Sequence, residues 1–370
     1  MPFTLLDVEA SAPGGWAGAF VRRPAGLDAL LDGFGAQAHA KADARLGCAG
    51  WAALAGLQAI LDLLHRWHGS RYGAELDLLA AASERGRAEL LLANLAYDLG
   101  TLGCSTFLQD GRAGPLHARN LDWPFPGTLL RRHGCVLRVH GAPAGGYAVV
   151  GWPGLVGALT AVAPGRFTVS VNFVRHRHGG LGRLLARAAR GALPVPWAVR
   201  DALDHARTFA EATERLRRAP LLAPVLLALA GPRRGEAVVL ERTACGAELR
   251  RPLEGALCLA NHYQAAGLAR ASVDYDEGGS SARLALLERG LARSAPADAG
   301  AALRLLAPAV RPETQQQVVM RARDGLFVVR VPGERARAID LTAIGGGGAR
   351  RPARSAVRAP PPARPARRRG

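Results

Sequence analysis

The chain has 370 residues, 49% of them apolar, which is enough for one large α/β unit or for two smaller domains. Its net charge of +18 is no argument for a nucleic-acid partner, because Lys41 is the only lysine and the excess of Arg, Ala, Gly and Pro is typical of GC-rich coding. No stretch has the unbroken apolar length of a membrane span, and residues 1–15 lack the basic and apolar regions of a signal peptide. We therefore expect a soluble, cytoplasmic protein.

The first hundred residues are predicted to be mostly helical. Residues 1–26, which contain Pro and Gly, indicate a strand or loop lead-in, and from Leu27 to about Gly100 the apolar residues follow the spacing of helices. The strongest segments are residues 51–64 and 83–99. Packing against a core is the expected role of these helices.

A β-hairpin is predicted where the helical pattern ends. Apolar residues after Cys104 lead into the turn-forming run 109–115, and a second short run, residues 116–121, follows. The return strand would bring Arg119 and Asp122 back towards Cys104. A lone cysteine usually fills space in the core, and an ordinary core residue remains the alternative interpretation of Cys104.

The residue types in this hairpin suit a cysteine nucleophile. The thiolate is the reactive form of cysteine, and an adjacent guanidinium such as that of Arg119 favours it. If the bond before Cys104 is cut, the residue gains an α-amine that titrates around pH 8 and can accept the thiol proton, with Asp122 to orient it. Arg119 and Asp122 are three residues apart, so a straight strand places them on opposite faces. Both reach one site only if the strand kinks or ends near Leu121, which Pro124 and Pro126 favour.

Short strands follow, separated by Gly and Pro, at residues 135–140, 147–152, 155–162 and 167–173. In the last of these, alternation places Thr168, Ser170 and Asn172 on one face. Residues 175–178 carry two histidines at a spacing of two, with no third ligand nearby, which favours a solvated loop over a metal site.

Residues 181–230 are predicted to return to helix, with a capping box at Thr208 and Glu211. Strands are then expected at residues 236–241, 247–252 and 257–260, and a closing hairpin at residues 317–331 that turns at Asp324-Gly325. Asn261 ends the strand 257–260, where an amide side chain suits an oxyanion hole.

The five cysteines, at positions 48, 104, 135, 245 and 258, show no CxxC pair and no metal-ligand spacing. An odd, scattered set favours reduced thiols over a disulfide framework, and we expect neither metal nor cofactor. The chain ends in a Gly run and a tail with eight arginines from Arg350 onward and no acidic residue. Such a segment buries too little apolar surface to fold and is predicted to be disordered.

Several segments together resemble one protein family. The hairpin looks like the nucleophile hairpin of the acid ceramidase and N-acylethanolamine acid amidase family, which is related to the choloylglycine hydrolases. The similarity continues, in order and to about residue 335, through residues 93–98, 194–197, 208–212 and 261–263. It covers about two-thirds of the chain.

The resemblance implies an N-terminal-nucleophile (Ntn) hydrolase that is made as a precursor, cleaves itself before Cys104 and then hydrolyses linear amide C–N bonds. The implied fold class is α/β (α+β), an αββα four-layer sandwich with a helical N-terminal segment. Residues 1–103 would form that segment, residues 104–335 the catalytic domain and residues 345–370 the tail.

The resemblance also implies roles for single residues. Cys104 is the nucleophile with its own α-amine as base, Asp122 holds the amine, and Arg119 supports the thiolate and the substrate. Asn261 and Asn172 bind the oxyanion. The family's Asp-Asp-Arg-Arg run is absent, and residues 278–283 look more like relatives that transfer acyl groups to penicillin-type amines. Arg283 is then the candidate for the second family arginine.

The implied substrate is a small-molecule N-acyl amide with an apolar acyl chain. An acyltransferase with the same site is the alternative, and a non-catalytic binding protein on this scaffold is the rival from another class. The arginine tail would add a weak contact with anionic membranes or polyanions, without a specific nucleic acid. The helices of residues 27–100 could instead meet a lipid surface, as the first segment of the resembled amidases does.

Overall fold

The structure of the protein is a computed structural model. The described residues are 3–12, 14–21, 24–47, 50–68, 71–99, 103–124, 128–177, 180–243, 246–273 and 279–344. The predicted disordered tail, Cys48, Cys245, His178 and Pro126 lie outside these residues.

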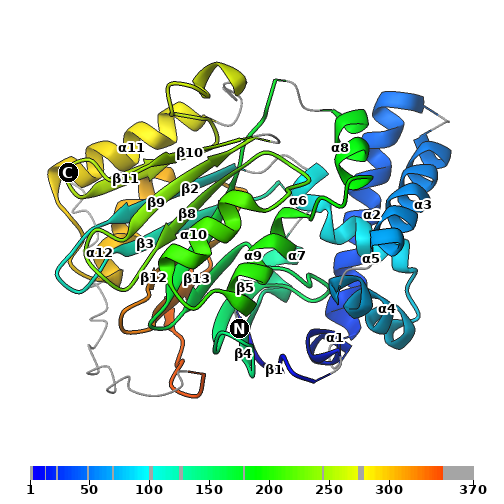
Figure 1. Ribbon diagram of the computed structural model, residues 1–370, viewed down its shortest axis with the longest axis horizontal. Helices are drawn as coiled ribbons and strands as arrows, with labels where there is room; N and C mark the ends of the chain where they lie inside the picture. The colour runs from blue at the N-terminus through cyan, green and yellow to red at the C-terminus, as the bar shows by residue number, and fades with distance from the viewer. Residues whose placement is uncertain are drawn as a thin grey trace, which may run out of the picture.

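The described strands form two sheets (Figure 1). The first sheet has eight strands, which follow one another in space as β1 (Thr4–Glu9), β4 (Cys135–His140), β5 (Tyr147–Gly151), β6 (Thr160–Ala163), β7 (Phe167–Phe173), β8 (Val225–Ala230), β9 (Ala237–Arg242) and β10 (Ala247–Arg250). The second has six, in the order β11 (Ala256–Leu259), β2 (Gly103–Gln109), β3 (Leu116–Asp122), β12 (Thr314–Arg321), β13 (Leu326–Arg330) and β14 (Arg337–Ala338). Neighbouring strands are antiparallel, except that β1 pairs in parallel with β4.

Helices precede the hairpin and cover the sheets. The N-terminal helices are α1 (Gly15–Val21), α2 (Pro24–Leu46), α3 (Gly50–His68), α4 (Arg71–Ser83), α5 (Arg87–Asn94) and α6 (Ala96–Leu99). The later ones are α7 (Leu129–His133), α8 (Leu181–Ala188), α9 (Val195–His205), α10 (Phe209–Arg218), α11 (Ser280–Arg293) and α12 (Ala299–Leu306), with 3₁₀ turns at Ala269–Ala271 and Ala307–Ala309.

The two sheets pack face to face between helix layers. Strands β2 and β12 of the smaller sheet contact β7 of the larger one, so polar and apolar side chains of both sheets fill the space between them. Helices α9 and α10 cover the outer side of the eight-stranded sheet, and α11 and α12 cover the outer side of the six-stranded sheet. The predicted four-layer sandwich with a helical N-terminal segment is confirmed (Figure 1).

The N-terminal lead-in contains more regular structure than predicted. Residues Thr4–Glu9 form the expected strand, but Gly15–Val21 form a helix that the sequence pattern does not predict. This helix has only seven residues, too few to show a period, and it is held by burial of Trp16, Ala17, Ala19 and Phe20.

Two later predictions of secondary structure are wrong. Residues Val225–Ala230 form strand β8 and not a helix; both faces of this strand are buried, so its sequence is uniformly apolar and lacks the alternation of a half-buried strand. Residues 155–159 form a loop, and the strand begins only at Thr160. In that loop Gly157 lies against Pro196, where a Cβ atom would be 2.6 Å from the proline ring.

Two predictions made from short sequence motifs, a helix cap and a hairpin turn, are confirmed. The Thr208 hydroxyl accepts a hydrogen bond from the Glu211 amide at 3.1 Å and caps α10 as predicted. The β12–β13 hairpin turns at Gly325, whose φ of +67° suits glycine. The folded body extends to Ile344, since Ile339, Leu341 and Ile344 are buried against the inner face of the larger sheet.

Candidate active site

The β2–β3 hairpin places Arg119 beside the Cys104 thiol. Cys104 lies opposite Leu121 and Thr106 lies opposite Arg119, so the side chains of Cys104 and Arg119 share one face of the sheet. The Arg119 Nη2 is 3.3 Å from the Cys104 Sγ, and both residues are fully buried. The predicted pairing of these two side chains is therefore present in the fold.

Arg119 is a buried cation held by neutral acceptors. Its guanidinium donates to the Leu159 carbonyl at 2.9 Å and also to the Thr160 hydroxyl and the Val171 carbonyl. Within the described part of the chain, none of its hydrogen bonds goes to a carboxylate. Negative charge on the neighbouring sulfur would therefore be stabilised by this guanidinium.

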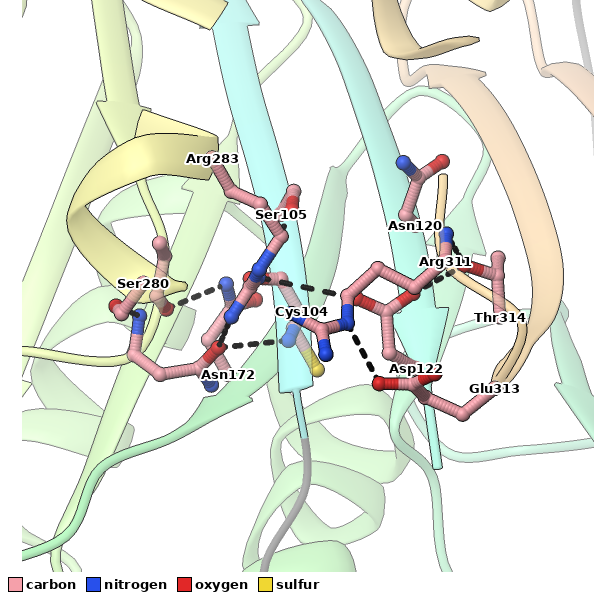
Figure 2. Close-up of polar contacts among 12 residues, drawn as sticks. Cys104, Ser105, Asn120, Asp122, Asn172, Ser280, Arg283, Arg311, Glu313 and Thr314 are labelled. Carbon is pink, nitrogen blue, oxygen red and sulfur yellow. Dashed lines mark hydrogen bonds and ion pairs between the residues drawn. The ribbon is translucent and has the colours of Figure 1, made fainter. Parts of the chain in front are cut away.

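Asp122 lies on the other face of the hairpin. Strand β3 stays regular as far as Asp122, so the kink near Leu121 that would turn its side chain toward the thiol does not occur. Its Oδ1 accepts a hydrogen bond from the Thr314 hydroxyl at 2.6 Å, and its Oδ2 is 3.8 Å from Arg283 Nη1 (Figure 2). Burial raises the pKa of the Asp122 carboxyl, and Thr314 and Arg283 partly oppose that rise.

The carboxylate of Asp122 faces Gly103, the residue before Cys104. The two residues are directly opposite in the β2–β3 register. A Cβ atom built on Gly103 would lie 3.3 Å from Asp122 Oδ2 and 3.7 Å from Arg283 Nη2. Asp122 is thus placed at the Gly103–Cys104 bond, not at the sulfur.

Arg283 and Asn261 hold the backbone of Cys104. Arg283, in the first turn of α11, donates from Nη1 to the Cys104 carbonyl and to the Ser105 hydroxyl, the latter at 2.9 Å (Figure 2). Its Nη2 donates to Asn261 Oδ1 at 2.7 Å, and the same oxygen accepts the Cys104 N–H at 2.8 Å. Burial lowers the pKa of Arg283, and the charge of Asp122 partly opposes that fall.

The two asparagines predicted for the oxyanion use their amide nitrogens on backbone carbonyls. Asn172 Nδ2 donates to the Ala260 carbonyl at 2.9 Å, and Asn261 Nδ2 donates to the Phe173 carbonyl at 2.7 Å. Each amide nitrogen carries a second N–H, so an oxyanion role for both stays a prediction. Asn172 also links the sheets, because its Oδ1 accepts the Thr106 hydroxyl at 2.8 Å.

The predicted polar face of β7 is present and points into the space between the sheets. Thr168 and Ser170 bind the two ring nitrogens of His117 at 2.9 and 2.8 Å. Burial, with the charge of Arg119, lowers the pKa of His117 to about 3, so the ring is neutral at pH 7. This histidine is fully satisfied by hydroxyls and is a structural residue of the core.

The Cys104 thiol is buried in an apolar cluster that includes a residue of the N-terminal segment. Tyr97 of α6 and Trp123 belong to the same buried cluster as Cys104, and the Tyr97 ring packs edge-on against Phe173 at 6.2 Å. Burial raises the pKa of the Tyr97 hydroxyl well above its usual value, and charge on Cys104 adds to the effect. In this uncut chain the sulfur has no exposure to solvent.

The sequence pattern does not reveal the residues that support the site from α11 and β12. Thr314 lies opposite Asp122 in the β3–β12 register, and Ser280 accepts the Asn261 backbone N–H at 2.8 Å. Arg311 and Glu313 form an ion pair at 2.6 Å next to Thr314 (Figure 2). Ser280 lies in the run 278–283 that resembles the acyl-transferring relatives, but that resemblance assigns it no role, and no motif marks Thr314, Arg311 or Glu313. Long-range register between β3 and β12 brings Thr314 to the hairpin, and α11 brings Ser280.

Two other structural features are absent from the described residues. No three His, Cys, Asp or Glu side chains gather as metal ligands among them. A helix long and apolar enough to cross a bilayer is likewise missing from the described part of the chain.

Comparisons with known proteins point to amidases. No family profile matches the chain. The N-acylethanolamine-hydrolyzing acid amidase of Cavia porcellus is 34% identical over 161 residues, which is 43% of this chain and 44% of the relative. The acid ceramidase of Heterocephalus glaber is 28% identical over 199 residues, which is 50% of each. The chain thus spans about half the length of the curated relatives that it matches.

Two solved structures align with more than half of the chain. The Caenorhabditis elegans ortholog of N-acylethanolamine-hydrolyzing acid amidase aligns with a TM-score of 0.49 at 21% identity, over 59% of this chain and 92% of that chain. A conjugated bile acid hydrolase from Clostridium perfringens aligns with a TM-score of 0.42 at 12% identity, over 66% and 93%. By sequence, the resemblance to the N-acylethanolamine acid amidase and acid ceramidase family that the motifs predict is therefore confirmed.

Proposed function

We propose that this chain is a cysteine Ntn amidase, which hydrolyses linear amide C–N bonds after cutting itself before Cys104. The observation that carries the proposal is the 3.3 Å contact between Arg119 Nη2 and the buried Cys104 Sγ. A buried arginine whose charge has no carboxylate partner among the described residues suits a thiolate better than it suits a structural thiol.

The first step of the proposed mechanism is self-cleavage. The thiol adds to the Gly103 carbonyl carbon, the Gly103–Cys104 C–N bond breaks, and the thiol proton ends on the Cys104 nitrogen. Water then hydrolyses the Gly103 thioester, which leaves a carboxylate on Gly103 and a free thiol and α-amine on Cys104. Asp122 lies against Gly103 and, with its raised pKa, is suited to pass a proton to the leaving nitrogen.

The second step repeats this chemistry on a substrate. The α-amine takes the thiol proton, the sulfur attacks the amide carbonyl, and the amine of the substrate leaves with that proton. Water then releases the acid from the thioester. Arg119 stabilises the sulfur anion in the resting enzyme.

Access to the sulfur would follow from the cut. Cys104 is fully buried while the chain is continuous, and Tyr97 of α6 belongs to the same apolar cluster. After cleavage α6 lies four residues before a free chain end at Gly103, so the backbone no longer ties it to Cys104. The exposed site would be lined by apolar side chains, among them Leu121, Trp123 and Phe173.

The proposed substrate is a small N-acyl amide with an apolar acyl chain. Two observations support it: the apolar surroundings of Cys104 and the names of the matched relatives, which hydrolyse N-acylethanolamines or are ceramidases. Acyl transfer to an added amine is the alternative for the same site, and products that contain that amine would reveal it.

The experiment compares Cys104→Ser with Cys135→Ser, because both cysteines are buried in strands and only the first contacts Arg119. Each variant is checked for folding by circular dichroism and assayed against a panel of N-acyl amides. We expect Cys104→Ser to lose turnover and Cys135→Ser to keep it. A folded Cys104→Ser protein with unchanged turnover would overturn the proposed function.

A further inference from the structure

The side-chain amide of Asn261 is held in one orientation by its neighbours. Its Oδ1 accepts hydrogen bonds from Cys104 N and from Arg283 Nη2, at 2.8 and 2.7 Å, and its Nδ2 donates to the Phe173 carbonyl at 2.7 Å. Exchanging the oxygen and nitrogen would set the NH₂ group against two donors and the oxygen against a carbonyl. The chemistry of the three neighbours therefore fixes which atom faces Cys104.

The backbone of Asn261 is fixed as well. Its N–H donates to the Ser280 hydroxyl at 2.8 Å, and the same hydroxyl binds the His262 Nδ1 at 2.7 Å. Asn261 itself is 2% exposed. The oxygen that accepts the Cys104 N–H thus belongs to a buried residue whose backbone is also hydrogen-bonded.

We propose that Asn261 positions the α-amine of mature Cys104 through its Oδ1. This inference rests on the proposed function, because the amine exists only after the bond to Gly103 is cut. The nitrogen that carries the amide N–H in the uncut chain is the atom that becomes the amine, so its acceptor is already in place. The neutral amine donates one N–H to Oδ1 and keeps its lone pair for the thiol proton.

This role differs from the predicted oxyanion role, which needs an N–H of Asn261. It also gives Asn261 a share in holding the α-amine, a role predicted for Asp122 alone. The Asp122 carboxylate faces Gly103. An oxygen acceptor stabilises the ammonium form, so the pKa of the amine measures the contact directly.

The test titrates the amine in the purified, self-cleaved protein. Iodoacetamide first blocks the Cys104 thiol, and acetic anhydride then labels amines at a series of pH values, read by mass spectrometry of the peptide that begins at Cys104. The α-amine of residue 1 is the internal reference. We expect Asn261→Asp to raise the labelling midpoint by about one pH unit or more, because a carboxylate favours the ammonium.

Two further variants remove the acceptor and provide a control. Asn261→Ala removes the acceptor and should lower the midpoint, whereas Asn172→Ala, which changes a neighbouring buried asparagine without a bond to Cys104 N, should leave it unchanged. Equal midpoints in wild type, Asn261→Asp and Asn261→Ala would overturn the proposal.

A structure of the cleaved wild-type protein provides a second measurement if the Asn261 variants do not fold. The proposal requires the amine nitrogen within hydrogen-bond distance of Asn261 Oδ1, and an amine bound by Asp122 alone would contradict it. A chain that stays uncut while it turns over amides is a different outcome: it refutes the proposed function, and this role of Asn261 with it.

Discussion

Gly103 lies directly opposite Asp122 in the central hairpin, and a Cβ atom on Gly103 would be 3.1 Å from Asp122 Cβ and 3.3 Å from its Oδ2. The carboxylate therefore reaches the bond before Cys104 only because residue 103 has no side chain. The thiol of Cys104 points to the opposite face, toward Arg119. One strand thus presents its backbone to one set of groups and its sulfur to another.

Gly103→Ala should slow self-cleavage. The added methyl group forces Asp122 to move by a few tenths of an ångström, and overpacking of this kind costs about 1–3 kcal/mol. If this cost raises the activation free energy of self-cleavage, the cleavage rate drops roughly tenfold. Gly111→Ala is the matched control in the turn of the same hairpin, where the nearest atom would be 3.5 Å away. Gel analysis of the cut fraction against time decides the matter, and equal rates for Gly103→Ala and wild type would contradict the account.

Asp98→Asn should stabilise the protein at neutral pH but not in acid. Burial raises the pKa of the Asp98 carboxyl to about 8, while the Val195 amide at the start of α9 donates to it at 3.1 Å. Between pH about 4, the usual pKa of Asp, and about 8 the unfolded chain releases this proton and the folded chain keeps it. The free energy of unfolding contributed by Asp98 therefore falls as pH rises through that window.

The measurement for Asp98 is thermal unfolding at pH 4 and at pH 7.5. Asn keeps an oxygen that can accept the Val195 N–H, so the variant should match wild type in acid and melt higher at pH 7.5. Asp324→Asn, at an exposed ion pair with Arg321, is the control and should show no such gain. The same difference between Asp98→Asn and wild type at both pH values would show that the carboxyl is not held protonated.

Arg200→Leu should destabilise the fold by about 3–5 kcal/mol, because it leaves buried carboxylates without their cation. Arg200 of α9 donates to Glu75 of α4 at 2.8 Å, lies 3.7 Å from Asp204 and stacks 4.2 Å from the Trp16 ring. It thereby joins the N-terminal segment to the sandwich. Denaturant unfolding measures the loss, and Arg215→Leu, at an exposed ion pair with Asp201, should cost under about 1 kcal/mol. Equal losses for the two variants would refute the role of the buried cluster.

Two truncations should locate the end of the folded body. A chain that ends at Ile344 keeps the buried residues Ile339, Leu341 and Ile344 and should retain its melting temperature and turnover. A chain that ends at Arg335 loses Ile339, Leu341 and Ile344, each a burial of about 1.5–3 kcal/mol, and should melt several degrees lower. A loss of turnover in the chain that ends at Ile344, without a change in its melting temperature, would show that residues 345–370 take part in the chemistry.

The sequence predicts the fold and the chemical core of the site where the evidence is local. The hairpin, the contact between Cys104 and Arg119 and the cap of α10 all depend on residues close together in sequence. The strict alternation of strand faces also anticipated that Arg119 and Asp122 separate unless the strand bends. It does not bend, and the Asp122 carboxylate faces Gly103 on the other side of the hairpin.

Other features depend on tertiary context that no local pattern carries. Strand β8 is uniformly apolar because sheet neighbours and helices bury both of its faces, so its sequence does not differ from that of a buried helix. Thr314 and Ser280 reach the site through β12 and α11, which lie more than 150 residues further along the chain than Cys104. The orientation of the Asn261 amide depends on Arg283 and Phe173, and no spacing predicts it.

The central claim is that Cys104 becomes an N-terminal nucleophile. Mass spectrometry of the purified, active protein, combined with sequencing of its amino termini, tests it most directly. The account predicts two chains, residues 1–103 and a chain that begins at Cys104, with turnover proportional to the cut fraction. Full activity in a single chain whose Cys104 nitrogen is still bound to Gly103 would contradict it.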